Sequence, residues 1–110
     1  MAQSFKRYLS RSIGTGATDV GGYTVAANTQ VTCIGLTLAN RTGSTVEVDA
    51  SVYDAANETY LVVNAPVPAG GALVVIGGDQ KVVLETGDSI RVTSNAASSI
   101  DAVLSVLELT

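Results

Sequence analysis

Few residues of this chain are of a type that could do covalent or acid–base chemistry. Its 110 residues include one cysteine, Cys33, and no histidine. A serine or cysteine nucleophile needs an adjacent base, which is usually histidine, and a zinc site needs several cysteine or histidine ligands. Cys33 also lies inside the apolar run VTCIGLTL, where a cysteine behaves as a small buried hydrophobe. We therefore expect neither nucleophilic catalysis nor a zinc site.

Carboxylates suggest two further kinds of site. Glu47 and Asp49 are two residues apart in an alternating segment, so they share one strand face, and paired carboxylates can hydrolyse glycosides. Asp79, Glu85 and Asp88 lie in the stretch DQKVVLETGDS, and calcium binds closely spaced carboxylate oxygens. The first pair is more typical of a solvated strand face, and the second group of a hairpin turn. We expect no catalytic residue and no metal site.

The segment IGTGATDVGG raises the question of a dinucleotide site, because it contains Gly-x-Gly. That fingerprint needs a preceding strand, a third glycine at a fixed spacing and a following helix. Here the next segment is GYTVAAN, which has the pattern of a strand. We interpret Gly14, Gly16, Gly21 and Gly22 as hinge and turn residues. We expect no cofactor and predict that the protein is not an enzyme.

The elements that must position these residues have the apolar–polar period of two that is typical of β-strands. They predict an all-β, single-domain antiparallel β-sandwich that is jelly-roll-like, with about eight or nine strands and a short N-terminal arm. The predicted strands are 22–28, 30–40, 45–54, 58–64, 72–76, 80–85, 89–94 and 98–110, with APVPAGG at 65–71 as a loop.

Two of these strands have faces that bear on packing. In QVTCIGLTLAN, strict alternation gives a single apolar face, made of Thr32, Ile34, Leu36 and Leu38. The last strand has one apolar face at the even positions from Ile100 to Val106, and Val103, Leu107 and Leu109 make its other face apolar as well. A strand that is apolar on both faces is covered on both faces. We expect a second subunit or the N-terminal segment to cover it.

The composition limits the classes of partner. The net charge is −4, so we do not expect nucleic-acid binding, which needs clustered lysine and arginine. The sequence has no apolar run long enough to span a membrane. Only 15% of the residues are charged, against about a quarter in an average domain. A weakly charged surface favours association, so we expect a homo-oligomer, with a trimer as the guess.

The first residues differ in charge from the rest. Lys6, Arg7 and Arg11 are three of the six basic residues, and the first acidic residue is Asp19. We divide the chain into segment 1–13, a basic docking arm or a first β-strand, and a β-sandwich domain, 14–110. Arginine and aromatic residues are favoured at interfaces. The candidate interface residues are Phe5, Lys6, Arg7, Tyr8, Leu9, Arg11, Leu107 and Leu109.

Five short motifs resemble those of a group of small virion structural proteins of tailed bacteriophages, cyanophages among them. The resemblance covers most of the chain, and its motifs consist of strand and turn residues. They are a strand end at 24–27, a strand leading to a turn at 35–40, a proline–glycine loop at 66–71, a hairpin at 84–92 and a closing strand at 101–108. Ala27 stands where the group would have proline.

The resemblance implies a structural part of a phage particle, located in the virion and assembled in the host cytoplasm. The role expected first is capsid decoration, in which a homo-oligomer binds the lattice of the major capsid protein. The alternatives are a subunit associated with the neck, tail or fibres, or a β-module that binds a receptor or carbohydrate.

Overall fold

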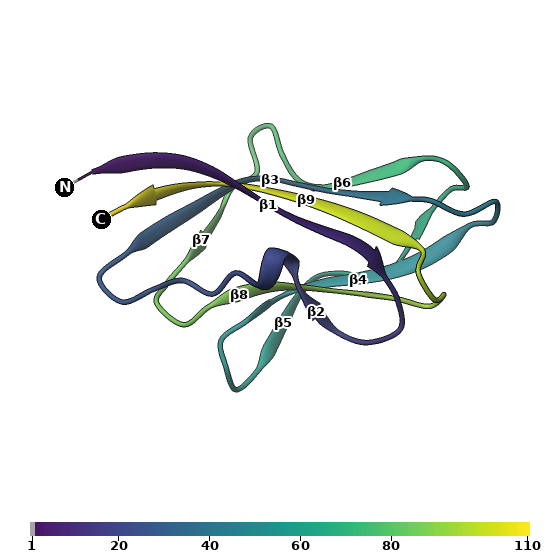
Figure 1. Cartoon of the computed structure of the whole chain (residues 1–110), viewed down its shortest axis with the longest axis horizontal. Helices are drawn as coiled ribbons and strands as arrows, with labels where there is room; N and C mark the ends of the chain where they lie inside the picture. The colour runs from purple at the N-terminus through teal and green to yellow at the C-terminus, as the bar shows by residue number, and fades with distance from the viewer. Residues whose placement is uncertain (1) are drawn as a thin grey trace.

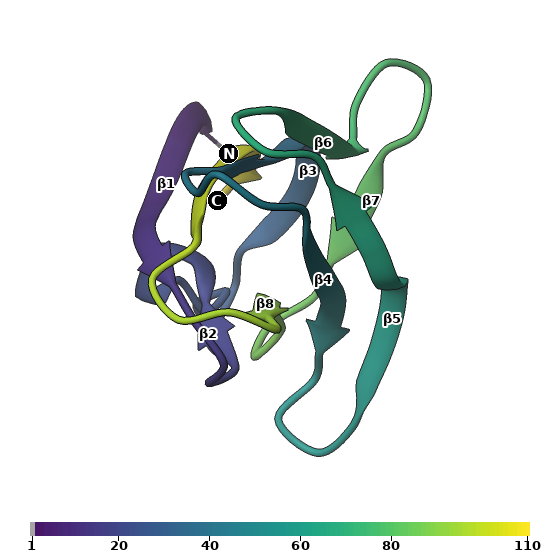
Figure 2. The same ribbon diagram turned by 90° about the vertical axis from the view of Figure 1, so that its right-hand side faces the viewer.

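The computed structural model describes residues 2–110, which form two antiparallel β-sheets packed face to face (Figures 1 and 2). Met1, the first residue of segment 1–13, lies outside the described residues. Within them no α-helix forms, and the one helical element is a 3-10 turn, η1 (Val20–Gly22). The strands are β1 (Gln3–Ile13), β2 (Thr18–Asp19), β3 (Gln30–Asn40), β4 (Val46–Tyr53), β5 (Glu58–Val67), β6 (Ala72–Ile76), β7 (Val82–Leu84), β8 (Ser89–Ser94) and β9 (Ile100–Leu109).

The order of the strands is that of a jelly roll. Sheet A has the order β1-β9-β3-β6, with β7 also paired to β3, and sheet B has the order β2-β8-β4-β5. When β6 and β7 are taken together as one interrupted strand, eight strands fill two four-stranded sheets, as in two Greek keys. The predicted all-β antiparallel sandwich is therefore confirmed.

Strict alternation produces the core in the regular strands. In β4 the apolar residues face sheet A, and Glu47 and Asp49 lie on the opposite face. In β9 the even positions from Ile100 to Val106 are buried. β4 and β9 thus send alternate side chains into one shared apolar layer. The largest fully buried side chains include Leu36, Leu38, Ile76, Leu84, Ile90, Ile100 and Leu104.

The face predicted for β3 is half wrong. Val31 and Cys33 are buried with Leu36 and Leu38, whereas Thr32 lies on the outer face. The pairing of β3 with β9 shifts register between Cys33 and Gly35. Such a β-bulge adds one residue to one strand, which moves every following side chain to the other face. Strict alternation across this point therefore assigned Thr32 and Ile34 to the wrong face.

Two element boundaries also differ from the prediction. Residues 23–26 of GYTVAAN form no strand, although Val25 exchanges backbone hydrogen bonds of 3.0 and 2.9 Å with Asp88 and Gly87. The loop predicted at 65–71 begins later, because β5 continues through Pro66 to Val67. β5 is the edge strand of sheet B, where proline is tolerated because one side of the strand makes no ladder hydrogen bonds.

The first thirteen residues, as far as they are described, form part of the sandwich. β1 pairs with β9 from Gln3 to Ile13, and the backbones of Ala2 and Thr110 exchange hydrogen bonds of 2.8 and 2.9 Å. Both termini consequently lie side by side at one end of the molecule (Figure 1). β1 lies beside β9 at the edge of sheet A, so it leaves the outer face of β9 uncovered.

Candidate interaction surface

The outer face of sheet A is the candidate surface for a partner, because it exposes large apolar side chains. Its strands alternate, and the outward positions hold several large apolar side chains. The exposed fraction is 76% for Phe5, 69% for Val83 and 64% for Val74. Leu9 and Val103 are also exposed. A folded domain normally shields such side chains when they are contiguous.

The strand register joins these residues into two rows. In the first row, Phe5 lies opposite Leu107, Leu107 opposite Thr32, and Thr32 opposite Val83. In the second row the corresponding residues are Leu9, Val103, Thr37 and Val74. The rows are four residues apart along β1, about 13 Å, and each crosses four strands, about 14 Å. We call these eight residues the apolar face.

Basic residues accompany the apolar face. Arg7 lies opposite Ser105, between the two rows, and Arg11 is exposed near the other end of β1. Neither arginine makes an ion pair with any residue from 2 to 110. Asp101, an acidic residue of β9, already pairs with Arg41 at 3.7 Å. The face therefore combines apolar rows with free positive charge.

The inward residues of β1 have a different role. Tyr8 stacks on Tyr23, with ring centroids 4.0 Å apart, and Lys6 pairs with Glu108 at 3.0 Å. The hydroxyl groups of Tyr23 and Tyr8 donate hydrogen bonds to the same Glu108 carboxylate, at 2.5 and 3.4 Å. This Glu108 cluster attaches β1 to β9 and to the segment that follows η1.

The Glu108 cluster shifts the pKa values of its members. The hydrogen bond from Tyr23 is the main cause that lowers the pKa of Glu108, with Lys6 and Tyr8 adding to it. Burial, followed by the hydrogen bond to Glu108, raises the pKa of Tyr23. The Glu108 carboxylate raises the pKa of Lys6 by the hydrogen bond that it accepts from this side chain. The cluster therefore holds an ionised Glu108 and a neutral Tyr23, which suits a structural tie.

The eight candidate interface residues are thus divided by the two faces of the strands. Arg11 is exposed on β1, at the register shift between Ser10 and Ile13. The outward positions of β1 and β9 hold Phe5, Arg7, Leu9, Leu107 and Leu109. Lys6 and Tyr8 instead belong to the Glu108 cluster. Sequence reasoning missed Val74 and Val83, because the alternation shows an outward valine without showing which strands lie next to it.

The outer face of sheet B is acidic. Asp19, Glu47, Asp49 and Glu58 lie on its strands, together with Arg91. The guanidinium of Arg91 pairs with Asp19 at 2.9 Å and with Glu58 at 3.7 Å, and it lies 3.6 Å from the centre of the Tyr53 ring. Glu47 is exposed, and Asp49 accepts a hydrogen bond from the backbone N–H of Asn64 at 2.7 Å. Four carboxylates and one guanidinium leave this face negatively charged.

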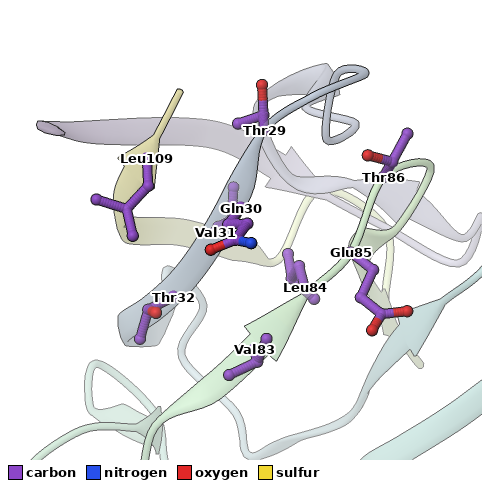
Figure 3. Close-up of a pocket in the computed structure, with 9 residues that line it drawn as sticks. All are labelled: Thr29, Gln30, Val31, Thr32, Val83, Leu84, Glu85, Thr86 and Leu109. Carbon is purple, nitrogen blue, oxygen red and sulfur yellow. The ribbon is translucent and has the colours of Figure 1, made fainter. Parts of the chain in front are cut away.

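A groove of about 480 Å³ lies at the end of sheet A that holds the termini. Figure 3 shows Leu109 on one side of it and Glu85 and Thr86 on the other, with β3 between them. Threonine, glutamine and apolar side chains make up most of its lining. Glu85 is the one carboxylate among its lining residues.

Other chemistry has little support in the part of the chain that is described. Cys33 is fully buried, and burial raises the pKa of its thiol to about 12, which makes it unreactive at neutral pH. Residues 2–110 hold no group of three or more histidine, cysteine or acidic residues that could bind a metal. None of the helices described there is long and apolar enough to cross a membrane.

Comparison with known proteins identifies a fold and no family. No protein-family model matches the chain. No curated protein matches it either. Among solved structures, the chain is similar to a protein described in the words "Bacillus endospore appendages form a novel family of disulfide-linked pili", with a TM-score of 0.53 and 15% identity. The match covers 99% of this chain and 87% of the other, so the two share the β-sandwich architecture.

Proposed function

We propose that this chain is a non-enzymatic structural subunit of a tailed-phage virion, and specifically a capsid decoration protein. The observation that carries the proposal is the apolar face of sheet A, which a lone copy leaves in water. Such a face is stable in a larger assembly, because each Å² of apolar surface removed from water contributes about 25 cal/mol. The sequence motifs shared with small phage virion proteins support the choice of particle.

The proposed mechanism is mechanical. A decoration protein adds buried area across the junctions between capsid subunits, and this area resists their separation. Neighbouring copies of the decoration protein contact each other through the exposed members of the apolar face, together with Arg7 and Arg11, which pair with carboxylates of the neighbour. No step of this function requires a nucleophile, a metal or a cofactor.

A low-copy subunit of the neck, tail or fibres is the second candidate. The structural similarity to a pilus protein favours it, because a pilus is likewise an elongated assembly. The pili of that similar protein are disulfide-linked. Here the single cysteine is buried in the core, so contacts between copies of this chain would be non-covalent.

The test is the number of copies in the particle. We would purify phage particles from the source of this sequence and quantify the chain by mass spectrometry against the major capsid protein. About one copy per capsid subunit is the expected result. A ratio of a few per cent, on the order expected for a ring at the neck or tail, would replace capsid decoration by the second candidate. Absence of the chain from the particle would overturn both.

A further inference from the structure

The two outer faces of the sandwich differ in charge, and this difference indicates what covers the apolar face. Arg7 lies on the outer face of sheet A, and Arg11 is exposed on the same strand. Neither arginine pairs with an acidic residue between positions 2 and 110. The outer face of sheet B carries four carboxylates against Arg91. Opposite potentials of this kind attract, whereas two copies of the same face repel each other. The two faces of one molecule are therefore complementary to each other.

We propose that the apolar face of one copy packs on the acidic outer face of sheet B of the next copy. The contact is thus heterologous, because it joins two different surfaces: the outer face of sheet A in one copy and the outer face of sheet B in the next. Arg7 and Arg11 of the first copy meet Glu47 and Asp49 of the second. This inference deepens the proposed function, on which its biological setting rests, by naming a second copy of the chain as the partner.

The acidic face also offers apolar contact area to the opposing rows. Tyr60 is half exposed on β5, and Val63 on the same strand is exposed by 56%. Tyr60 uses its hydroxyl group to bind Glu58 at 2.9 Å, so its ring is held in place before association. An aromatic ring held in this way is a favourable anchor, because little side-chain freedom is lost when the partner arrives.

A heterologous contact has a consequence for the shape of the assembly. Each contact uses the outer face of sheet A of one copy and the outer face of sheet B of the other. A dimer therefore still has one free face of each kind, and further copies can add to it. Association continues until the rotation between copies closes a ring, or it produces an open filament. With two sheets about 10 Å apart in each copy, successive copies are spaced by roughly 20 Å.

The experiment uses two complementary charge reversals in the purified full chain. The first variant, R7E/R11E, makes the outer face of sheet A acidic. The second, E47K/D49K, leaves three basic and two acidic residues on the outer face of sheet B, so the net charge of this face becomes positive. Mass is measured by sedimentation over a range of concentrations, and circular dichroism checks the fold. The control variant, D79K, changes the charge in the loop between β6 and β7.

We expect the wild type and D79K to form species larger than dimers. Each double variant alone should associate at least about tenfold more weakly than the wild type. Mixing the two double variants should restore species larger than dimers, because alternating copies again present opposite charges. If D49K disturbs the backbone contact with Asn64, E47K alone serves, since Glu47 is exposed. Its expected effect is smaller and in the same direction.

Two results would overturn the inference. One is a wild-type chain that stays monomeric at high concentration. The other is an E47K/D49K variant that associates as well as the wild type, because the acidic face would then play no part. The purified chain is tested without particles, so either result leaves the copy number in the virion as a separate test of the proposed function.

Discussion

The inner and outer faces of the β1–β9 pair belong to the same two strands but differ in their surroundings. On the inner face, Tyr8 stacks on Tyr23 and donates a hydrogen bond to Glu108, which also pairs with Lys6. On the outer face, Phe5 and Leu9 are exposed to solvent beside Arg7. The inner face therefore accounts for the stability of β1 in the sandwich. The outer face contributes little to folding and remains available for a partner.

The largest expected effect is the difference in stability lost when a buried and an outward leucine of β9 are replaced by alanine. Leu104→Ala creates a cavity in the core, where Leu104 is fully buried, and we expect it to lower the free energy of unfolding by about 2–5 kcal/mol. Leu107→Ala, on the outer face of the same strand, should cost about 1 kcal/mol or less. Urea denaturation of both variants measures the difference. Equal losses would mean that the outer face is part of the folding core.

The next effect tests the contact between β1 and η1. Gly21 has a φ of +64°, and a Cβ at this position would lie 2.6 Å from Cβ of Tyr8. Gly22 has a φ of +65°, with nothing within 4 Å of such a Cβ. A non-glycine residue in this backbone region costs on the order of 1–3 kcal/mol. Gly22→Ala should show that cost alone, and Gly21→Ala should lose clearly more stability in thermal or urea unfolding.

Such a difference would come from displacement of β1. If the two variants lose equal stability, the close approach of η1 to β1 contributes nothing, and the inner face is less tightly packed than its geometry indicates.

A smaller effect concerns the pH dependence of the Glu108 cluster. Tyr23 lowers the pKa of Glu108 below 4.5, its ordinary value. A carboxyl group whose pKa is lower in the folded state stabilises the fold above its unfolded pKa, and this stability is lost as the pH falls through the folded pKa. Glu108→Gln should therefore lower stability at pH 7 by about 1–2 kcal/mol. It should also flatten the decline of stability below about pH 4.5.

The control for this prediction is Glu85→Gln, which changes an exposed carboxylate on the other side of the groove. It should leave both the stability at pH 7 and the slope at acidic pH nearly unchanged. A Glu108→Gln variant with the same acid profile as the wild type would show that the cluster does not hold the charged form.

The smallest effect on stability is expected for Phe5→Ser. Phe5 is exposed by 76%, so the free energy of unfolding should change by about 0.5 kcal/mol or less. Self-association, measured by sedimentation at the same protein concentrations, should weaken much more. A variant that unfolds more easily and associates normally would reverse the roles that we assign to the two faces.

Much of the fold could be predicted because alternation is a local property. Glu47 and Asp49 lie outside and their apolar neighbours inside, as the pattern of β4 indicates. The turn at Gly87 and the buried position of Cys33 follow from equally local signals. The predicted hairpin does not form there, because this turn connects β7 of sheet A to β8 of sheet B. The bulge in β3 could not be found in this way, since Cys33 and Gly35 carry no mark of the extra residue until β9 pairs beside them.

The sequence by itself determined that this chain is an all-β domain without histidine-based chemistry, with basic residues gathered near one end. The tertiary structure alone decided that Phe5, Thr32 and Val83 share a row, because these residues come together only through the register of β1, β9, β3 and β7. It also decided that Arg7 lies on the outer face opposite to the one that carries Glu47 and Asp49. Side-chain alternation depends on the backbone of one strand, whereas register depends on the packing of all of them.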